Sequence, residues 1–342
     1  MVLDAELRPK GLLGKTWLIC AAAAALLALP FLLRGGYVIR VINMILLYSI
    51  LAVGLNLIGG YGGQLAMGHA CYYGVGAYTS ALLAINLGWP FLPSLLAATA
   101  FSGLFGLATG FIALARITGD YLMLITMGIS EIVRIVLLNW VSLTKGPMGL
   151  PQVPQARLFS FTLKSGPEYY YLFLAALLLT ALATNRIVKS KFGRALVAIR
   201  EDETAAKAMG INSTFYKVVG FGISTLFAGM AGSLMAHYTR FVGPMQFSLD
   251  EGLLLFQMII VGGLGSISGS ILGAAILVTI PEIFRGIYQY RMLINGLLMV
   301  LMMIWKPQGL LGNIGGNHPW LRWRETVRRA CSCLGARKKL SD

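Results

Sequence analysis

Two ionisable side chains stand in the middle of an apolar segment of this sequence. Glu131 and Arg134 occur within DYLMLITMGISEIVRIVLLNW, and their i, i+3 spacing places them on one face of a helix. Ionised groups at membrane depth are costly unless they are paired or face water, so this pair is a functional candidate. It could handle a substrate, or it could be a structural ion pair that locks neighbouring helices, since mutual neutralisation leaves little net field for a zwitterionic ligand.

Glycines and polar residues gather in IGGYGGQLAMGHACYYGVGAY, the stretch from Ile58 to Tyr78. Glycine at this density allows unwound backbone and close helix approach, and broken helices near the membrane midplane commonly mark the substrate path of transporters. Tight packing alone is the alternative, and a lone histidine is more often a hydrogen-bonded structural residue. The candidate path residues of this first glycine turn are Gln64, Gly68, His69 and Tyr72.

A second glycine-rich turn occupies a matching place in the other half of the chain. It reads VGGLGSISGSILGAAIL, from Val261 to Leu277, and like the first it links an incoming apolar segment to an outgoing one. The correspondence suggests a weak internal repeat, a feature of many transporter folds. The candidate path residues of this second glycine turn are Gly262, Gly263 and Gly265.

The longest charged interval before the C-terminal tail runs from Arg186 to Lys217 and contains the polar loop 188–214. A helical period of apolar residues passes through it, which predicts a short amphipathic helix at the membrane surface with Gly193 and Gly210 at its ends. Lys and Arg resist translocation, so this loop is expected in the cytoplasm, where it can contact a partner. The apolar positions are Phe192, Leu196, Ile199 and Ala206.

The composition sets the class of protein that has to hold these residues. Hydrophobic residues make up 57% of the 342 residues, charged residues 12%, and the mean hydropathy is +0.75. Ordinary soluble domains do not reach such values, so we expect a polytopic integral membrane protein. The net charge of +15 arises from Lys and Arg between apolar runs and in the tail, which favours orientation in a bilayer over nucleic-acid binding.

The apolar runs predict an all-α fold of about ten transmembrane or half-membrane helices interrupted by the two glycine turns. A full crossing needs about 20 apolar residues. The eighth segment is too short for that and is expected to be a half-helix or re-entrant. The expected segments are 16–33, 38–58, 66–85, 92–115, 119–140, 169–187, 215–239, 251–264, 268–284 and 291–305.

The distribution of Lys and Arg predicts that both termini are cytoplasmic. With that orientation, 19 of the 28 basic residues fall inside, 8 fall outside and Arg134 lies within a span. This bias follows the positive-inside rule. Outside, the loop 141–168 is long enough to carry function and could form a landing surface with 241–250, although a solvated connection is the alternative.

Three regions follow from this layout. Residues 1–15 form a cytoplasmic N-terminus, and 16–312 form the membrane domain with its cytoplasmic loop. Residues 313–342 form a basic cytoplasmic tail, in which Trp320, Trp323 and the arginines are expected to rest on anionic lipid headgroups. The sparse cysteines do not suggest a disulfide framework.

The sequence lacks the motifs of an enzyme. It contains no complete Walker A motif, no paired His/Cys spacing for a metal and no G-x-S-x-G nucleophile elbow. We therefore expect no catalytic residue, no metal and no cofactor in this chain. If ATP energises transport, partner subunits bind it.

At this point the chain resembles the LivM family, the permease subunits of bacterial branched-chain amino acid ABC importers. The resemblance covers residues 38–312 and is carried by four stretches in the right order. They are GGYGGQLAMGHACYYGVGAY, GDYLMLITMGISEIVRI followed by TKGPMGL, GRALVAIREDETAAKAMGI, and MLINGLLMVLMMIWKPQGLLG.

The resemblance implies a subunit of the bacterial inner membrane with several partners. These are a second, LivH-like permease, two cytoplasmic ATPases (LivG-like and LivF-like), and a periplasmic binding protein that delivers Leu, Ile or Val. The polar loop would then be the segment that couples the permease to the ATPases. It loosely matches the E-A-A-x-x-x-G pattern of ABC permeases, except that Thr204 takes the glutamate position. The implied coupling residues are Arg200, Glu201, Asp202, Glu203, Ala205, Ala206 and Gly210.

In the mechanism that this implies, ATP binding closes the ATPase pair, the coupling helix moves as a rigid body, and the permease opens to alternate sides. The other interpretations are a urea or amide ABC importer, which shares the glycine turns, and an ion-coupled secondary carrier, which the EAA-like loop disfavours. A structural or receptor-like membrane protein would leave the midmembrane glycines without a purpose.

Overall fold

Backbone in hydrocarbon has to satisfy its own hydrogen bonds, and the long apolar segments of this chain accordingly form helices. The computed structural model describes residues 36–114, 120–158, 161–163, 166–283, 291–306 and 308–311. Within this part the chain forms twelve α-helices with three short 3₁₀ or π segments and four two-residue strands, so the all-α prediction is confirmed.

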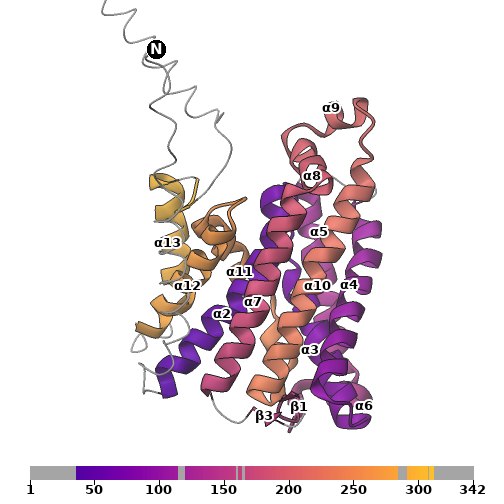
Figure 1. Cartoon of the computed structure of the whole chain (residues 1–342), viewed down its shortest axis with the longest axis vertical. Helices are drawn as coiled ribbons and strands as arrows, with labels where there is room; N and C mark the ends of the chain where they lie inside the picture. The colour runs from indigo at the N-terminus through magenta and orange to yellow at the C-terminus, as the bar shows by residue number, and fades with distance from the viewer. Residues whose placement is uncertain are drawn as a thin grey trace, which may run out of the picture.

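The helices run largely side by side (Figure 1). Their bounds are α2 Gly36–Asn56, α3 His69–Asn86, α4 Phe91–Leu114, α5 Asp120–Asn139, α6 Val141–Thr144, α7 Gly166–Lys189, α8 Lys191–Glu201, α9 Glu203–Ala208, α10 Ser213–Thr239, α11 Leu249–Gly262, α12 Ile267–Ile283 and α13 Arg291–Trp305. The other elements are η1 Leu57–Tyr61, η2 Gly146–Met148, η3 Pro244–Phe247, β1 Leu150–Pro151, β2 Arg157–Leu158, β3 Phe161–Thr162 and β4 Phe241–Val242.

Nine of the ten expected segments coincide with a helix, while the first, 16–33, lies outside the described residues. So do the N-terminus 1–15 and the tail 313–342. Among the described residues, five helices are long and apolar enough to cross a membrane: α2 with η1, α4, α5, α7 and α10. The chain is thus a multi-pass membrane protein, and α11, with 14 residues, is as short as the sequence predicted.

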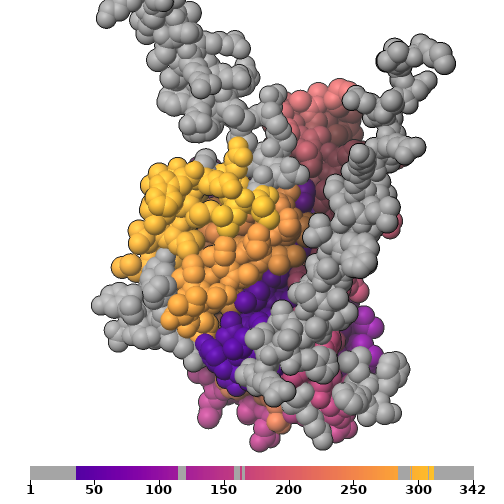
Figure 2. Space-filling model, turned by 60° about the vertical axis from the view of Figure 1, so that its left-hand side comes forward, coloured from indigo at the N-terminus to yellow at the C-terminus, as the bar shows by residue number. Residues whose placement is uncertain are grey.

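The core is built around α10. In the most apolar 18-residue stretch of this helix, 83% of the residues are buried. Small residues on α10 let α3 come close: a Cβ added to Gly232 would lie 2.1 Å from the carbonyl oxygen of Tyr73. By contrast, only 17% of the residues in the most apolar 18-residue stretch of α5 are buried within the chain. Figure 2 shows α12 beside α2, with α13 on the other side of α12.

The two ends of the bundle differ in kind (Figure 1). One end carries α8 and α9, and the other carries the short strands. There β1 pairs with β4, Leu150 opposite Val242, which joins the two loops that the sequence predicted as a common outer surface. One span, α7, separates the loop 141–168 from the polar loop, so the polar loop and this surface lie on opposite faces of the membrane.

Candidate functional site

The two glycine turns meet at a buried asparagine. The first turn leaves the helix through η1 and the non-helical segment 62–68, and the second is the break 263–266 between α11 and α12. Asn56, at the end of α2, accepts a hydrogen bond from the backbone N–H of Gly265 at 2.9 Å. Its Nδ2 donates to the Ser266 carbonyl at 2.9 Å and to the Ser270 hydroxyl at 2.7 Å. Asn56 thereby fixes the second turn against the first.

Glycine is required where the turns touch. A Cβ on Gly60 would lie 1.8 Å from Asn56 Oδ1 and 2.3 Å from the Gly265 nitrogen, which no relaxation of a side chain could relieve. Gly63 and Gly265 have φ values of +66° and +77°, a region that side chains with a Cβ rarely adopt. The predicted break in each helix is therefore present, and the two breaks form one contact.

The other predicted glycines serve close backbone packing. A Cβ on Gly68 would lie 2.0 Å from the Thr126 carbonyl oxygen, and one on Gly262 would lie 2.1 Å from that of Gly269. Gly263 lies against Gly309: a Cβ added to Gly309 would lie 2.4 Å from Gly263 Cα. Gln64 is buried, and its backbone N–H donates to the Ile58 carbonyl at 3.0 Å.

His69 does not have the hydrogen bonds expected of a structural histidine. It is fully buried at the start of α3, and within the described part of the chain neither ring nitrogen has a hydrogen-bond partner. Its ring centroid lies 6.1 Å from that of Tyr72, whose hydroxyl shares a 2.8 Å hydrogen bond with Thr109. Both residues belong to the first part of α3, and Tyr72 contacts α4 and α10 through Thr109 and Phe221.

Glu131 and Arg134 form the expected ion pair on α5. Arg134 Nε donates to Glu131 Oε2 at 2.9 Å, and Nη2 donates to the other carboxylate oxygen. The side chains are 32% and 21% exposed. Apart from a 3.9 Å contact of Arg134 Nη1 with the Met245 sulfur, the described residues show no polar bond from this pair to another helix. The pair therefore locks no neighbouring helices by charge.

The polar loop forms two helices instead of the single amphipathic helix that the sequence predicted. Asp202 is the reason: its carboxylate accepts hydrogen bonds from the backbone N–H groups of Thr204 at 2.8 Å and Ala205 at 2.9 Å and so starts a new helix. Ser190 caps α8 through Gly193 N–H, so Gly193 lies inside α8 and not at a helix end. Gly210, with φ +83°, follows α9 as predicted.

The predicted apolar face of this loop packs inward. Leu196 and Ile199 of α8 and Ala206 of α9 are buried, and the Phe192 ring lies 5.3 Å from that of Tyr216. Ala205 and Gly210 are exposed, as is Met209, whose exposure reaches 83%. Sequence reasoning missed Met209. The available signal was an apolar residue next to Gly210 in an otherwise polar loop.

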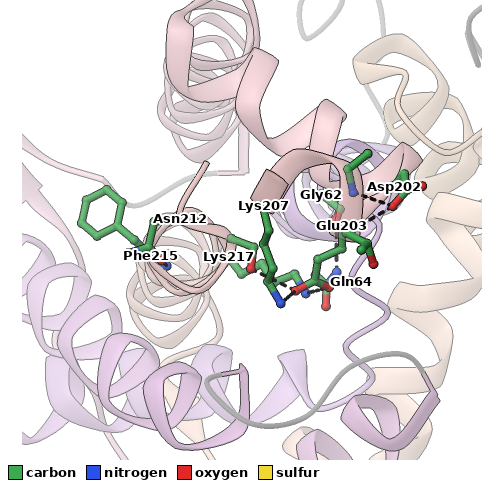
Figure 3. A network of polar contacts seen from close by, with 11 residues as sticks. Gly62, Gln64, Asp202, Glu203, Lys207, Asn212, Phe215 and Lys217 are labelled. Carbon is green, nitrogen blue, oxygen red and sulfur yellow. Dashed lines mark hydrogen bonds and ion pairs between the residues drawn. The ribbon is translucent and has the colours of Figure 1, made fainter. Parts of the chain in front are cut away.

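Glu203 is held by three donors (Figure 3). Lys217 Nζ lies 2.5 Å and Lys207 Nζ 3.0 Å from its carboxylate, and the Ser213 hydroxyl donates at 3.0 Å. Burial by itself raises the pKa of Glu203, but these hydrogen bonds and the charge of Lys217 outweigh it and lower the pKa to about 2. Glu203 thus fastens α9 to the buried Lys217 of α10 and offers little to a partner.

Arg200 connects the polar loop to the glycine turns. Its Nη1 donates to the carbonyl oxygen of Gly60 at 2.9 Å, and its Nε and Nη2 donate to Glu201 at 3.2 and 2.5 Å. The Glu201 side chain is 67% exposed. Of the predicted residues, the structure therefore brings together Arg200 and Gly265, beside Gly60 and Gly63, which were not predicted. Glu131, Arg134 and His69 lie on other helices.

Two cavities open at the end with the strands. One of about 580 Å³ is lined by Arg40, Gln155 and Arg240, and one of about 940 Å³ by Trp89, Arg157 and His237 among others. None of the predicted path residues lines either cavity.

Comparison with known proteins gives consistent results. The model of the family described as branched-chain amino acid transport system / permease component matches residues 37–304. The permease protein LivM of Salmonella typhimurium is 40% identical over 307 residues, which are 83% of this chain and 72% of that protein. LivM of Escherichia coli is 39% identical over 313 residues, with the same coverage.

A second group of relatives is more distant. The permease protein LivH of Escherichia coli is 28% identical over 293 residues, which are 78% of this chain and 91% of LivH. No solved structure matches the chain. The family model covers all the described helices apart from the first residue of α2 and the last of α13, and the identity to the LivM proteins extends over most of the sequence. The chain belongs to the branched-chain amino acid transport system / permease component family.

Proposed function

We propose that this chain is a permease subunit of a binding-protein-dependent ABC importer that moves leucine, isoleucine and valine across the bacterial inner membrane. The observation that carries the proposal is the 40% identity to a high-affinity branched-chain amino acid permease over 83% of the chain. Separate subunits hydrolyse ATP, because the sequence has no complete Walker A motif of its own.

The arm formed by α8 and α9 is the proposed contact with the ATPases. Its tip is exposed at Glu201, Asp202, Ala205 and Met209, whereas its inner face packs on the bundle. The capping bonds of Asp202 and the Glu203–Lys217 pair make the arm stiff enough to follow an ATPase as a rigid body. In this orientation both termini are cytoplasmic, as the positive-inside bias requires.

A second permease of the same family is the proposed partner within the membrane. The similarity to LivH over 78% of the chain means that two chains of related fold can pair face to face. The face of α5 suits this role, because it is largely unburied and carries a half-exposed ion pair that would be costly against lipid. We assign Glu131 and Arg134 to the substrate path between the two permeases.

The chemistry of the substrate agrees with such a path. A branched aliphatic side chain needs an apolar surface, and α5 presents Leu124, Ile132, Ile135 and Val136 on its exposed faces. The ammonium and carboxylate of the amino acid need a few polar groups, which Glu131 and Arg134 supply. Discrimination by one methylene contributes only about 1 to 3 kcal/mol, so most of the specificity is assigned to a periplasmic binding protein.

Transport by the reconstituted complex tests this proposal. Proteoliposomes hold this chain, a LivH-like permease and both ATPases, and each candidate binding protein is added in turn with labelled leucine or labelled urea. We expect leucine uptake that needs ATP and every subunit. Uptake of urea alone would reassign the chain to a urea or amide importer, and transport by the chain alone down an ion gradient would reject the ABC assignment.

A further inference from the structure

The side chain of Arg200, at the end of α8, bonds to the first glycine turn and lies near the second. Its Nη1 donates to Gly60 in the first turn at 2.9 Å. Its aliphatic carbons fill the space beside Gly63, where an added Cβ would lie 2.5 Å from Arg200 Cγ. An added Cβ on Gly265, in the second turn, would lie 3.6 Å from Arg200 Nη1. The guanidinium is thus bonded to the first turn and occupies the space next to Gly265 of the second.

The Gly60 carbonyl is a suitable acceptor because of the way its helix ends. Gly60 belongs to η1, and the chain leaves the helix after Tyr61, so the last carbonyls lack donors from a following turn. The end of a helix also carries a partial negative charge that attracts a cation. Arg200 therefore supplies to this carbonyl the hydrogen bond that a continuing helix would have made.

Glu201 fixes the direction of the guanidinium. Its carboxylate accepts from Arg200 Nε and Nη2, which leaves Nη1 directed at Gly60. A guanidinium can serve two acceptors on two of its edges because it is a rigid planar fork, whereas a lysine ammonium is a point charge on a flexible stem. Arginine is required here for its shape as well as its charge.

The contact continues from the first turn to the second through Asn56. Gly265 N–H donates to Asn56 Oδ1 at 2.9 Å, and Gly60 packs directly on both groups. A continuous path of contacts thus links the end of α8 through Gly60 and Asn56 to Gly265. All these contacts lie among described residues that are 140 and 209 positions apart in the chain.

We propose that Arg200 is a positioning residue that transmits the displacement of the arm α8–α9 to both glycine turns. The proposal rests on the proposed function, because it assumes that an ATPase moves this arm. Without the bond from Arg200 to Gly60, the arm would still bind the ATPases but would move without the turns. ATP would then be hydrolysed with little transport.

The test compares Arg200 with Arg194 on the same helix. Arg194 is exposed, and its Nη1 donates to the Lys189 carbonyl at 3.1 Å, so it has the same charge and a backbone acceptor but no contact with the turns. Arg200→Lys, Arg200→Met, Arg194→Lys and Arg194→Met are reconstituted in the full complex. The measured quantities are subunit assembly, ATP hydrolysis stimulated by the binding protein, and solute transported per ATP.

We expect both Arg200 variants to assemble and to hydrolyse ATP within about twofold of the unchanged complex, while solute transported per ATP falls about tenfold. The Arg194 variants should keep the ratio. An unchanged ratio in Arg200→Lys and Arg200→Met overturns the proposal. Loss of assembly in both, with normal Arg194 variants, also overturns it, because Arg200 would then be a purely structural residue.

A positional readout separates transmission from general damage. Ser268, next to the second turn, is replaced by cysteine in a chain whose native cysteines are serine, and its rate of thiol labelling is measured with and without trapped nucleotide. The rate should change with nucleotide when Arg200 is present and should stay constant in Arg200→Met. If the unchanged complex carries urea instead of leucine, urea transported per ATP is measured in the same variants. The proposal on the substrate and the proposal on Arg200 can therefore fail independently.

Discussion

Two acid–base pairs in this molecule have similar chemistry and opposite placement. Glu203 and Lys217 join two helices, and the Lys217 side chain is 2% exposed. Glu131 and Arg134 lie one turn apart on the same helix, and their side chains are 32% and 21% exposed. The first pair is enclosed by the chain, whereas the second has a surface that another molecule can contact. An acid–base pair is therefore informative about contacts with a partner or substrate only when the chain does not enclose it.

Removing the carboxylate of the enclosed pair should have the largest effect. Glu203→Ala leaves the Lys217 ammonium buried without its main partner, and we expect a loss of about 3 kcal/mol in the free energy of unfolding. Thermal denaturation of the purified complex measures it. The matched control is Lys207→Ala, which removes an exposed partner of the same carboxylate and should cost less than about 1 kcal/mol. Equal losses in the two variants would show that the burial of Lys217 does not require the carboxylate of Glu203.

The stability that Glu203 contributes should depend on pH in a defined window. Its pKa is lowered from 4.5 to about 2, so the contribution is complete above pH 4.5 and is lost as pH falls toward 2. By linkage, roughly half of it should be lost between pH 7 and pH 3. The measurement is the difference in denaturation between the unchanged chain and Glu203→Gln at each pH. A difference that stays constant down to pH 3 would contradict the enclosed ion pair.

Removing either charge of the unenclosed pair should change stability least. Glu131→Gln and Arg134→Gln should each alter the free energy of unfolding by less than about 1 kcal/mol, since the pair is half exposed and ties no helices. Leucine uptake should fall about tenfold, equivalent to about 1.4 kcal/mol in the transport barrier.

The exchanged double variant, Glu131→Arg with Arg134→Glu, sharpens this result. A structural pair works in either order, so restored assembly and uptake in the exchanged variant would return Glu131 and Arg134 to a structural role. Assembly without uptake in the single and the exchanged variants is the outcome expected of residues that contact substrate.

The positions of the helices were predictable because apolar length is a local property. The segments 92–115 and 215–239, for example, match α4 and α10 to within a few residues. The split of the polar loop was not predicted, because the period through Ile199 and Ala206 continues across Asp202, whose capping bonds act on only two backbone groups. Local capping outweighed the longer pattern.

The contacts that make the site were beyond the reach of sequence patterns. Glu203 and Lys217 are 14 residues apart, which on one continuous helix would separate them by about 21 Å, and Arg200 and Gly60 are 140 apart. Asn56 was missed although a lone asparagine at the end of an apolar helix was a signal of a buried hydrogen bond. Sequence reasoning selected both glycine turns and Arg200, but only the folded backbone shows that they touch.

The segment after α13 has a consequence for the order of synthesis. Leu310 and Leu311 donate their backbone N–H groups to the carbonyls of Val261 and Gly262, at 3.0 and 2.9 Å, and so complete the end of α11. The second turn thus receives its last hydrogen bonds from residues made long after it. At about 5 to 20 residues per second, a ribosome needs about 2 to 10 seconds to cover that interval. The second turn therefore reaches its final hydrogen bonding only after α12 and α13 have been synthesised.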